Sequence, residues 1–295
     1  MTVFATPAPS TSMLGRVCLV TGANSGLGVA TASGLARLGA TVIMLCRNID
    51  RGSAARDRVR AETGNENVSL VVADLASLDQ VRRAAAEIAR EHTHLHVLVN
   101  NAGIQARRRR VTIDGFEETL TVNHLAPFLL TSLLAPQLRA SAPARVVTVA
   151  SRVERMGRIH FDDLQLEHPY GPVRAYAQSK LANIMFTYEL AARLAGTGVT
   201  ANCLHPGYVN TGLMRESPDW MRALWRPFLP DADRGAATAL YLAAAPNVAT
   251  VTGGYFERCR PARSSRRSYD VAARRRLWDM SAALAGAPPL DAPLR

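Results

Sequence analysis

The stretch RVCLVTGANSGLG, Arg16–Gly28, decides the fold. It opens with an apolar run, Arg16–Val20, typical of a strand buried on both faces, and a helical pattern follows from Gly28. The turn between them is rich in glycine, which allows tight turning and a close approach of the backbone to a phosphate. A helix N-terminus adds free N–H groups and positive potential. The stretch therefore predicts a pyrophosphate-binding βα turn, with an ordinary βα turn as the alternative.

Apolar runs and helical patterns alternate along the rest of the chain. Strands are expected at Arg16–Val20, Thr41–Leu45, Val68–Val72, His96–Val99, Arg145–Ala150, Val199–Leu204 and Gly254–Phe256. Helices are expected at Gly28–Leu38, Asp50–Glu62, Leu78–Glu91, Asp114–Leu138, Ala175–Leu194 and Arg234–Ala244. This regular alternation indicates βαβ units with right-handed crossovers. We expect an α/β protein, a single-domain doubly wound parallel sheet of about seven strands, the Rossmann fold, with helices on both faces.

The composition fits one globular domain. The chain has 295 residues, 48% of them hydrophobic and 20% charged, and no apolar run is long enough to span a membrane. Residues 1–14 lack the features of a secretory signal and are expected to form a disordered leader. We assign 15–285 to the dinucleotide-binding and catalytic domain, 213–230 within it to a substrate lid, and 286–295 to a flexible tail.

The charge and the cysteines limit the function classes. The net charge of +11 is accounted for by two arginine clusters, Arg107–Arg110 and Arg258–Arg276. Two solvated clusters are favoured, and a nucleic-acid surface is the alternative. The four cysteines are scattered, which indicates buried reduced thiols in a cytoplasmic protein. We also expect no membrane anchor and no metal site, because the alternating His92, His94 and His96 have no acidic or cysteine partner nearby.

The segment Tyr176-Ala177-Gln178-Ser179-Lys180 is the strongest catalytic signal. Residues four apart on a helix share a face, so the Tyr176 hydroxyl and the Lys180 ammonium point the same way. A tyrosine with an ordinary pKa near ~10 is a poor base, and a nearby ammonium favours the phenolate. Lys180 is the only lysine among 35 basic residues, and arginine is bulkier with a more diffuse charge. We predict a general acid/base pair, with an ordinary surface pair as the alternative.

The end of the second expected strand predicts the cofactor. In this fold that strand end meets the adenosine ribose, where an acid would bond the ribose hydroxyls and repel a 2′-phosphate. Cys46 stands there instead, followed by Arg47, a bidentate phosphate partner. NADP(H) is therefore predicted over NAD(H), with a solvated loop arginine as the alternative.

Other polar residues fall where strands of the expected sheet end. Asp74 follows the third strand and could accept from the adenine amino group, and Asn100 ends the fourth. Ser151 follows the fifth strand on the same rim. Asn123 lies inside an expected helix, where a buried asparagine is disfavoured unless it has a role. Each of these side chains could instead form a hydrogen bond within a turn or to the nearby backbone.

Together these residues resemble the short-chain dehydrogenase/reductase family over about residues 14–285. The motifs are Thr21-Gly22-x-x-x-Gly26-x-Gly28, Asp74, Asn100-Asn101-Ala102-Gly103, Asn123, Ser151, Tyr176-x-x-x-Lys180 and Pro206-Gly207-x-x-x-Thr211. More narrowly, the chain is similar to the retinol-dehydrogenase-like branch. That likeness rests on Cys46-Arg47-Asn48, the segment Gly157–Leu164, Gly254-Tyr255-Phe256 with Cys259, and a tail containing Trp278.

The resemblance implies a role for each motif. Tyr176 would be the general acid/base, Lys180 would lower its pKa and hold the nicotinamide ribose, Ser151 would orient the substrate oxygen, and Asn123 would support a proton-relay water. The implied cofactor-binding residues are Gly22, Ser25, Gly26, Leu27, Gly28, Arg47, Asp74, Leu75, Asn100, Ala102, Gly103, Tyr176, Lys180, Pro206, Gly207, Val209 and Thr211.

The expected function is an NADP(H)-dependent oxidoreductase, a carbonyl reductase or alcohol dehydrogenase. Its partner would be a small, mid-sized apolar alcohol, ketone or aldehyde, because residues 213–230 are rich in Leu, Met and Trp. A homo-oligomer is left open. The alternatives are a C=C reductase of the protochlorophyllide-reductase-like type and a non-catalytic cofactor-binding protein.

Overall fold

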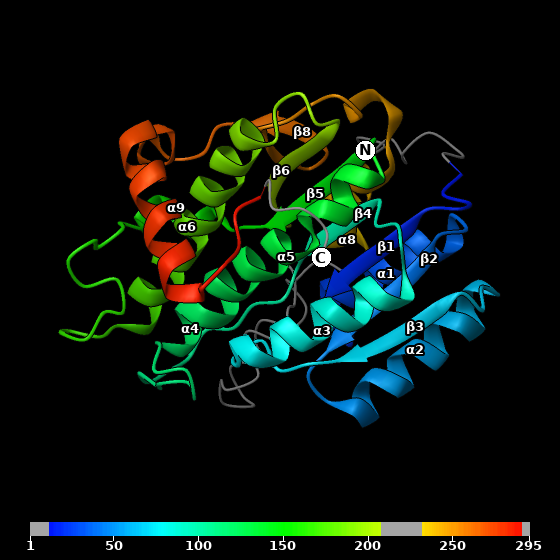
Figure 1. The fold of residues 1–295 in the computed structure, drawn as a ribbon, viewed down its shortest axis with the longest axis horizontal. Coiled ribbons are helices and arrows are strands. Elements are labelled where there is room, and N and C mark those ends of the chain that lie inside the picture. The colour runs from blue at the N-terminus through cyan, green and yellow to red at the C-terminus, as the bar shows by residue number, and fades with distance from the viewer. Residues whose placement is uncertain (1–11, 208–231, 291–295) are drawn as a thin grey trace, which may run out of the picture.

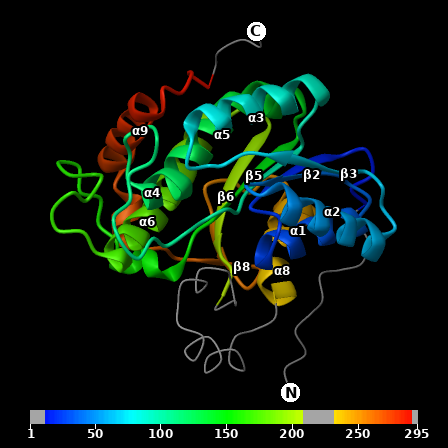
Figure 2. The same ribbon diagram turned by 90° about the horizontal axis from the view of Figure 1, so that it is seen from below.

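The computed structural model describes residues 12–207 and 232–290, and these ranges hold one sheet with helices on both of its faces (Figures 1 and 2). The eight strands of this described part run in the order β3-β2-β1-β4-β5-β6-β7-β8. They are β1 Val17–Thr21, β2 Thr41–Cys46, β3 Val68–Val72, β4 Val97–Asn100, β5 Ala144–Val149, β6 Val199–His205, β7 Tyr255–Glu257 and β8 Arg260–Ala262. All neighbouring pairs are parallel except β7 and β8.

The helices and short helical turns connect these strands. They are α1 Gly26–Arg37, α2 Ile49–Thr63, α3 Leu78–Glu91, α4 Glu118–Leu120, α5 Ala126–Ala140, α6 Pro172–Arg193, α8 Ala232–Ala244 and α9 Val271–Ala285. The short turns are the π-helical η1 Thr121–Leu125 and the 3-10 turns η2 Arg152–Met156, η5 Pro246–Val248 and η6 Arg266–Tyr269. No helix in the described ranges has both the length and the hydropathy to span a membrane.

Two hydrophobic cores, one on each face, explain why most strand residues are apolar. Cys18 and Val20 of β1 pack into the core formed with α1, α2 and α8. Leu19, between them, packs into the core formed with α3, α5, α6 and α9. Successive side chains of a strand point to opposite faces, so a strand covered on both sides needs an unbroken apolar run. The doubly wound parallel sheet predicted from these runs is confirmed.

Three features of the described fold differ from the prediction. Helix α9, Val271–Ala285, was not predicted. The long helix expected from Asp114 begins only at Glu118, because Gly115 has φ +83° in a turn closed by its N–H donating to the Thr112 carbonyl. The antiparallel strand β8 was not predicted. It follows a two-residue turn in which Arg258 and Cys259 both have positive φ, a conformation usually signalled by Asn or Gly.

Parts of the expected domain organisation lie outside the described residues. These parts are most of the 1–14 leader, the whole 213–230 lid and the second half of the 286–295 tail. Met13 is buried, and its N–H donates to the Leu38 carbonyl at 2.8 Å. Ala287 and Leu290 pack against the core on the α9 side.

Candidate active site

The glycine-rich turn after β1 forms a tight cradle. Gly22 and Gly26 have φ of +65° and +51°, which disfavour residues with a Cβ. A Cβ on Gly22 would lie 2.9 Å from the Ala102 Cα, and one on Gly28 would lie 2.2 Å from the Gly22 carbonyl oxygen. The turn therefore closes against the loop after β4, and α1 begins directly behind it. This arrangement fits a pyrophosphate at the N-terminus of α1.

Thr21 joins the turn to the loop after β4. The backbone N–H groups of Asn101 and Ala102 both donate to its Oγ1 at 3.0 Å. The Asn101 side chain returns a bond to the Thr21 carbonyl at 2.7 Å. The two loops are thereby fixed to one another at the edge where the parallel strands end.

We expect Gly28→Ala to lower the free energy of unfolding by about 1–3 kcal/mol, the usual cost of overpacking. The added Cβ would press on the Gly22 carbonyl, which is backbone and cannot rotate away. Gly171→Ala is the matched control, because its Cβ would meet only the Arg174 Cβ, at 3.5 Å. Denaturant unfolding of both variants checks the prediction. Equal stabilities would mean that the turn relaxes freely.

Tyr176, Lys180 and Ser151 meet at the carboxyl end of β5. Tyr176 and Lys180 are buried one turn apart on α6, with the Lys180 Nζ 5.6 Å from the centre of the Tyr176 ring. The Lys180 Nζ donates to the Val149 carbonyl at 2.9 Å. A side-chain hydrogen bond connects Ser151 to Tyr176. The structure therefore places the three residues together, as the sequence analysis expected.

Burial is the largest influence on the pKa values of Tyr176 and Lys180. Burial raises the pKa of Tyr176 to about 12, and the hydrogen bond from Ser151 opposes that shift. Burial lowers the pKa of Lys180 to about 8. Tyr176 is therefore a phenol at neutral pH, the form that can donate a proton. Burial and the Ser151 hydrogen bond, rather than the expected effect of Lys180, account for the shift.

Asn123 lies in the π-helical turn η1 and connects it to the loop after β4 and to α6. Its Oδ1 accepts from the Ile104 N–H at 2.7 Å, and its Nδ2 donates to the Ile104 carbonyl and to Ser179 Oγ, both at 2.9 Å. A Cβ on Gly103 would lie 3.3 Å from the Lys180 Nζ and 3.4 Å from Asn123 Oδ1. Asn123, Gly103 and Lys180 therefore form one closely packed group. Such π-turns are frequent at functional sites.

The end of β2 lies against the glycine-rich turn. Cys46 is buried and its thiol accepts from the Ala23 backbone, while burial raises the thiol pKa to about 11. Arg47 is exposed. Asn48 accepts the Arg51 N–H at 2.9 Å and so caps α2. Arg47 is therefore at the surface beside the turn, where a phosphate could reach it.

Among the remaining predicted cofactor contacts, Asp74, Leu75 and Asn100 lie at or just after the ends of β3 and β4. Asp74 Oδ1 accepts the Ala76 N–H at 3.0 Å, and Asn100 Nδ2 donates to Thr131 Oγ1 at 3.0 Å. Leu75 is buried. Ser25 precedes α1, Leu27 is buried within it, and Pro206 and Gly207 follow β6. Val209 and Thr211 lie outside the described residues.

Sequence reasoning missed the residues that hold the surrounding loops. Gln178, between the catalytic candidates on α6, accepts from the His160 N–H at 2.9 Å and donates to the Leu164 carbonyl at 2.8 Å. It fixes the long connection from Ser151 to Tyr176 against the helix. The Tyr-x-Gln-x-Lys pattern contains this residue, but the contact depends on a loop whose path the sequence does not reveal.

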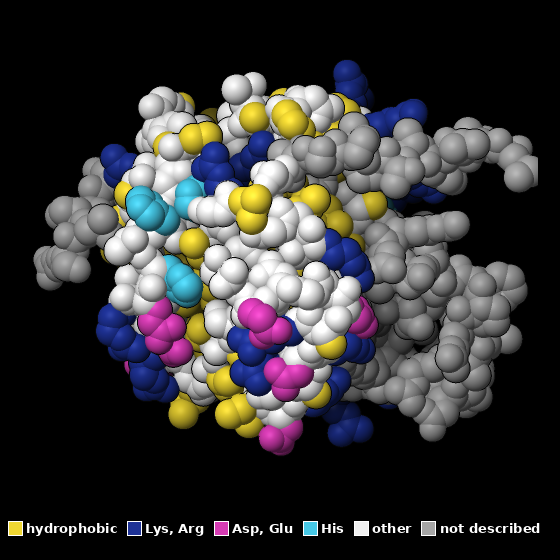
Figure 3. All heavy atoms as spheres, turned by 90° about the vertical axis from the view of Figure 1, so that its right-hand side faces the viewer, with side chains coloured by type: hydrophobic (Ala, Val, Ile, Leu, Met, Phe, Trp, Pro, Cys, Tyr) yellow, Lys and Arg dark blue, Asp and Glu magenta, His cyan; other side chains and the backbone are white. Residues whose placement is uncertain are grey.

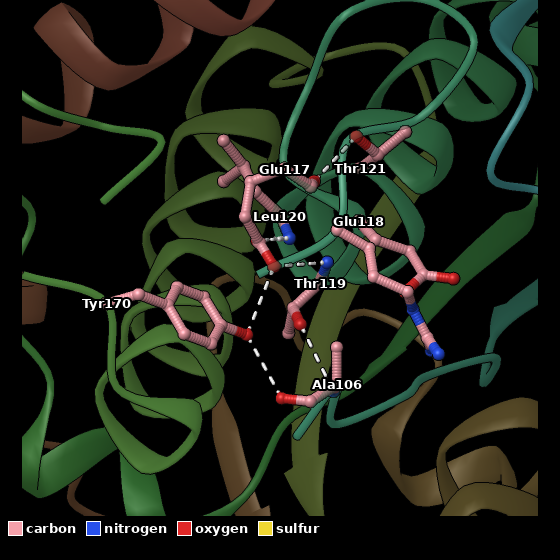
Figure 4. A network of polar contacts seen from close by, with 8 residues as sticks. Ala106, Glu117, Glu118, Thr119, Leu120, Thr121 and Tyr170 are labelled. Carbon is pink, nitrogen blue, oxygen red and sulfur yellow. Dashed lines mark hydrogen bonds and ion pairs between the residues drawn. The ribbon is translucent and has the colours of Figure 1, made fainter. Parts of the chain in front are cut away.

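Glu117 is a second missed residue, and it organises the start of α4 (Figure 4). Its carboxylate is buried and accepts the Thr119 and Leu120 N–H groups at 2.9 and 2.6 Å. The Tyr170 hydroxyl bonds both this carboxylate, at 3.4 Å, and the Ala106 carbonyl, at 3.0 Å. The loop before Tyr176 is thereby connected to the loop that precedes Asn123.

Two arginines of the C-terminal cluster, and Arg152 near it, contact other parts of the chain. Arg267 donates to the Gly157 carbonyl at 3.1 Å, and Arg276 lies 4.4 Å from the Phe161 ring. Arg152 pairs with Glu257. These contacts join the C-terminal segment to the Ser151–Tyr176 connection. Arg267 and Arg276 are both exposed, as expected of a solvated cluster, and each also makes one of these contacts.

The face on the side of α2 and β3 shows basic and acidic side chains interspersed rather than gathered (Figure 3). On α2, Arg56 pairs with Asp57, and Arg58 with Glu62. This part of the surface therefore has no continuous basic stripe of the kind that nucleic acid binding favours.

Two of the three alternating histidines have hydrogen-bond partners in the fold. His96 Nδ1 accepts the Val17 N–H at 3.0 Å, and His94 Nδ1 lies 3.3 Å from Ser141 Oγ. Cys18 and Cys203 are buried free thiols. No group of three or more His, Cys, Asp or Glu that could hold a metal occurs in 12–207 or 232–290.

Comparison with known proteins adds a family. The model of the short chain dehydrogenase family matches residues 16–222. Retinol dehydrogenase 11 of Mus musculus is 44% identical over 276 residues, 93% of this chain and 87% of the relative. Retinol dehydrogenase 14 of Homo sapiens is 45% identical, with 93% of this chain and 87% of the relative covered.

Solved structures show the same fold. A structure of an uncharacterized protein from Mycobacterium paratuberculosis has a TM-score of 0.78 and 38% identity, covering 94% of this chain and 95% of that one. A short chain dehydrogenase from Burkholderia cenocepacia in complex with NADP has a TM-score of 0.66 and 27% identity, covering 83% of this chain and 97% of that one.

Proposed function

Because the chain belongs to the short-chain dehydrogenase/reductase family, and resembles its retinol-dehydrogenase-like branch, we propose that it is an NADP(H)-dependent oxidoreductase with Tyr176 as general acid/base. Its substrate would be a mid-sized apolar alcohol, ketone or aldehyde. A cytoplasmic location and a homo-oligomer stay predictions.

The observation that carries this proposal is the meeting of Ser151, Tyr176, Lys180 and Asn123 at one strand edge. Tyr176 and Ser151 are hydrogen-bonded, and Lys180 and Asn123 flank Gly103. A protein that only binds a cofactor has no need of a buried phenol beside a buried lysine. The arrangement suits proton exchange with a substrate oxygen placed between Ser151 and Tyr176.

Each residue of the candidate site would have one role in hydride and proton transfer. The bound nicotinamide supplies or accepts the hydride. Tyr176 gives its proton to the substrate oxygen in reduction and takes it in oxidation, and Ser151 hydrogen-bonds the same oxygen. Lys180 would hold the ribose, and its positive charge would stabilise the phenolate once the proton has left. Holding the reactants in one geometry supplies much of the acceleration.

Two features of the described chain favour a dinucleotide with a 2′-phosphate. The glycine cradle and the N-terminus of α1 fit the pyrophosphate, and no side chain larger than hydrogen would fit at Gly22 or Gly28. Arg47 is exposed beside the turn, and Cys46 stands where an acid would repel the phosphate. These residues therefore fit NADP(H).

The substrate class rests on less direct support. The curated relatives carry the name retinol dehydrogenase, which indicates an alcohol as the substrate of those proteins. In this chain, the exposed side chains of Met156 and Val173 lie on η2 and α6, the elements that carry or adjoin Ser151 and Tyr176.

The test is a panel of alcohols, ketones and aldehydes supplied with NADPH or NADP⁺. Cofactor absorbance in the near ultraviolet is followed with the purified protein. We expect turnover of at least one apolar carbonyl compound, faster than that of small polar ones. Absence of turnover across the panel, with NADPH binding shown by calorimetry, would favour a non-catalytic cofactor-binding protein.

A further inference from the structure

Helix α9 contacts the turn that carries Asn123 through a buried hydrogen bond. His124, the next residue of η1, places its Nε2 2.8 Å from Ser281 Oγ on α9, and both side chains are buried. The Ser281 hydroxyl donates to the Leu277 carbonyl at 2.7 Å. The Ser281 oxygen thus has both the Leu277 carbonyl and the His124 Nε2 atom within hydrogen-bond distance.

His124 is suited to this role as a neutral ring. Burial lowers its pKa to about 4, so the imidazole stays uncharged at neutral pH. A neutral imidazole has one N–H, which on Nε2 would donate to Ser281 and on Nδ1 would donate to the Asn183 side chain. With the hydrogen on Nδ1, the Nε2 atom would accept from the Ser281 hydroxyl, so His124 and Ser281 are hydrogen-bonded in either tautomer.

Aromatic packing holds α9 where this bond can form. The Trp278 ring lies 4.7 Å from the Phe128 ring of α5 and 5.8 Å from the Phe186 ring of α6, measured between ring centres. The Arg193 guanidinium lies 4.5 Å from the centre of the Trp278 ring. Since Trp278 is three residues before Ser281, the same helix face carries both contacts.

The turn η1 needs such support because its backbone is π-helical. A π-turn is a local departure from the more stable α-helical geometry, and side-chain contacts must maintain it. Asn123 is held by Ile104 and Ser179. His124 is held by Ser281, from a segment more than 150 residues later in the chain.

We propose that α9 is part of the active-site framework, and that His124 and Ser281 are positioning residues that keep the π-turn and aim Asn123 at Ile104 and Ser179. Neither residue is among Ser151, Tyr176 and Lys180, which meet at the end of β5. The effect on turnover rests on the proposed function, whereas the effect on the geometry of Asn123 does not.

Amide hydrogen exchange of the ligand-free protein tests the geometry. The Ile104 N–H donates to Asn123 Oδ1, so its protection reports how firmly that side chain is held. We expect Ser281→Ala to reduce protection of the peptide containing Ile104 about tenfold, with peptides of β1 unchanged. Ser132→Ala is the matched control, because it removes a buried hydroxyl bonded only to the Phe128 carbonyl one turn earlier. Protection at Ile104 equal in the two variants would overturn the inference.

Turnover separates this inference from the proposed function. We expect kcat of Ser281→Ala to fall about 3- to 10-fold, the effect of losing one hydrogen bond, with the Kd for NADPH unchanged. Ser132→Ala should keep the wild-type kcat. An inactive wild type would contradict the proposed function and leave the exchange result standing. An active wild type whose Ser281→Ala variant keeps full kcat would contradict the coupling.

A second pair of variants leaves α9 unchanged. His124→Gln keeps an N–H donor at the end of a side chain of similar length, and His124→Leu does not. We expect the Gln variant to retain most of the Ile104 protection and the Leu variant to lose about tenfold. Equal exchange in these two variants would show that the hydrogen bond is not what holds the turn.

Discussion

Replacing Tyr176 with Phe is expected to lower kcat at least about 100-fold. The change keeps the buried ring and its packing but removes the hydroxyl that is hydrogen-bonded to Ser151. The variant loses the phenolic proton that would be given to the substrate oxygen, and the Lys180 Nζ is already directed at the Val149 carbonyl. The Kd for NADPH should change little, because the pyrophosphate cradle lies on another strand.

The matched control is Tyr188→Phe. Tyr188 is buried three turns farther along α6, and its hydroxyl bonds Ser264 rather than any active-site residue. The two variants lose the same group from the same helix, so kcat is expected to fall only in the first. Steady-state kinetics and calorimetric titration of NADPH measure the two effects. Comparable kcat values in both Phe variants would remove Tyr176 from the proposed chemistry.

The fold could be predicted because local patterns suffice for a doubly wound sheet. The strands in the middle of the sheet are covered on both faces and are therefore mostly apolar, as Leu19 between Cys18 and Val20 illustrates. The run and the following helix pattern give the βα unit, and regular alternation gives the topology. Val68–Val72 and Leu78–Glu91 are predicted with the bounds the structure has.

The C-terminal elements could not be predicted in the same way. Helix α9 has an arginine-rich start and little apolar periodicity, although Asp270 caps its first turn and Gly286, with φ +56°, ends it. These two caps were the available signal. Strand β8 has three residues and owes its place to a turn at Arg258 and Cys259, whose positive φ values are atypical for both residue types.

In the candidate site, too, contacts between residues close in sequence could be predicted, and contacts between distant residues could not. Tyr176 and Lys180 are four residues apart on one helix, so their proximity follows from helical geometry alone. The contact between His124 and Ser281 joins residues 157 positions apart, and that of Glu154 Oε1 with the Ser265 N–H joins residues 111 apart. Such contacts depend on tertiary packing. The raised pKa of Tyr176 also depends on how deeply the fold buries the ring.

The cofactor preference is expected to depend on Arg47. Arg47→Ala should lower kcat/KM for NADPH about 10–100-fold, because a hydrogen bond to a charged group contributes about 1.5–3 kcal/mol. The value for NADH should change little, since that cofactor has no 2′-phosphate. Arg47 is exposed at the end of β2 and has freedom to reach a phosphate beside the glycine-rich turn.

Adding Cys46→Asp to Arg47→Ala should shift the preference further toward NADH. The Cys46 side chain accepts a hydrogen bond from the Ala23 backbone, so a carboxylate there would keep that partner and bond the ribose hydroxyls. It would also repel a 2′-phosphate. Because position 46 is buried, the ligand-free double variant is expected to be less stable than the wild type and to regain stability when NADH binds.

The measurement is kcat/KM with each cofactor for the wild type, both variants and Arg58→Ala, which removes an exposed arginine farther along α2. Arg58→Ala should retain the wild-type ratio, because loss of general positive charge alone would not distinguish the cofactors. If it lowers the NADPH value as much as Arg47→Ala does, long-range attraction rather than a local phosphate contact sets the preference. If the wild type uses NADH and NADPH equally well, Arg47 is a solvated loop residue, and the absence of an acid at position 46 only permits the 2′-phosphate without selecting it.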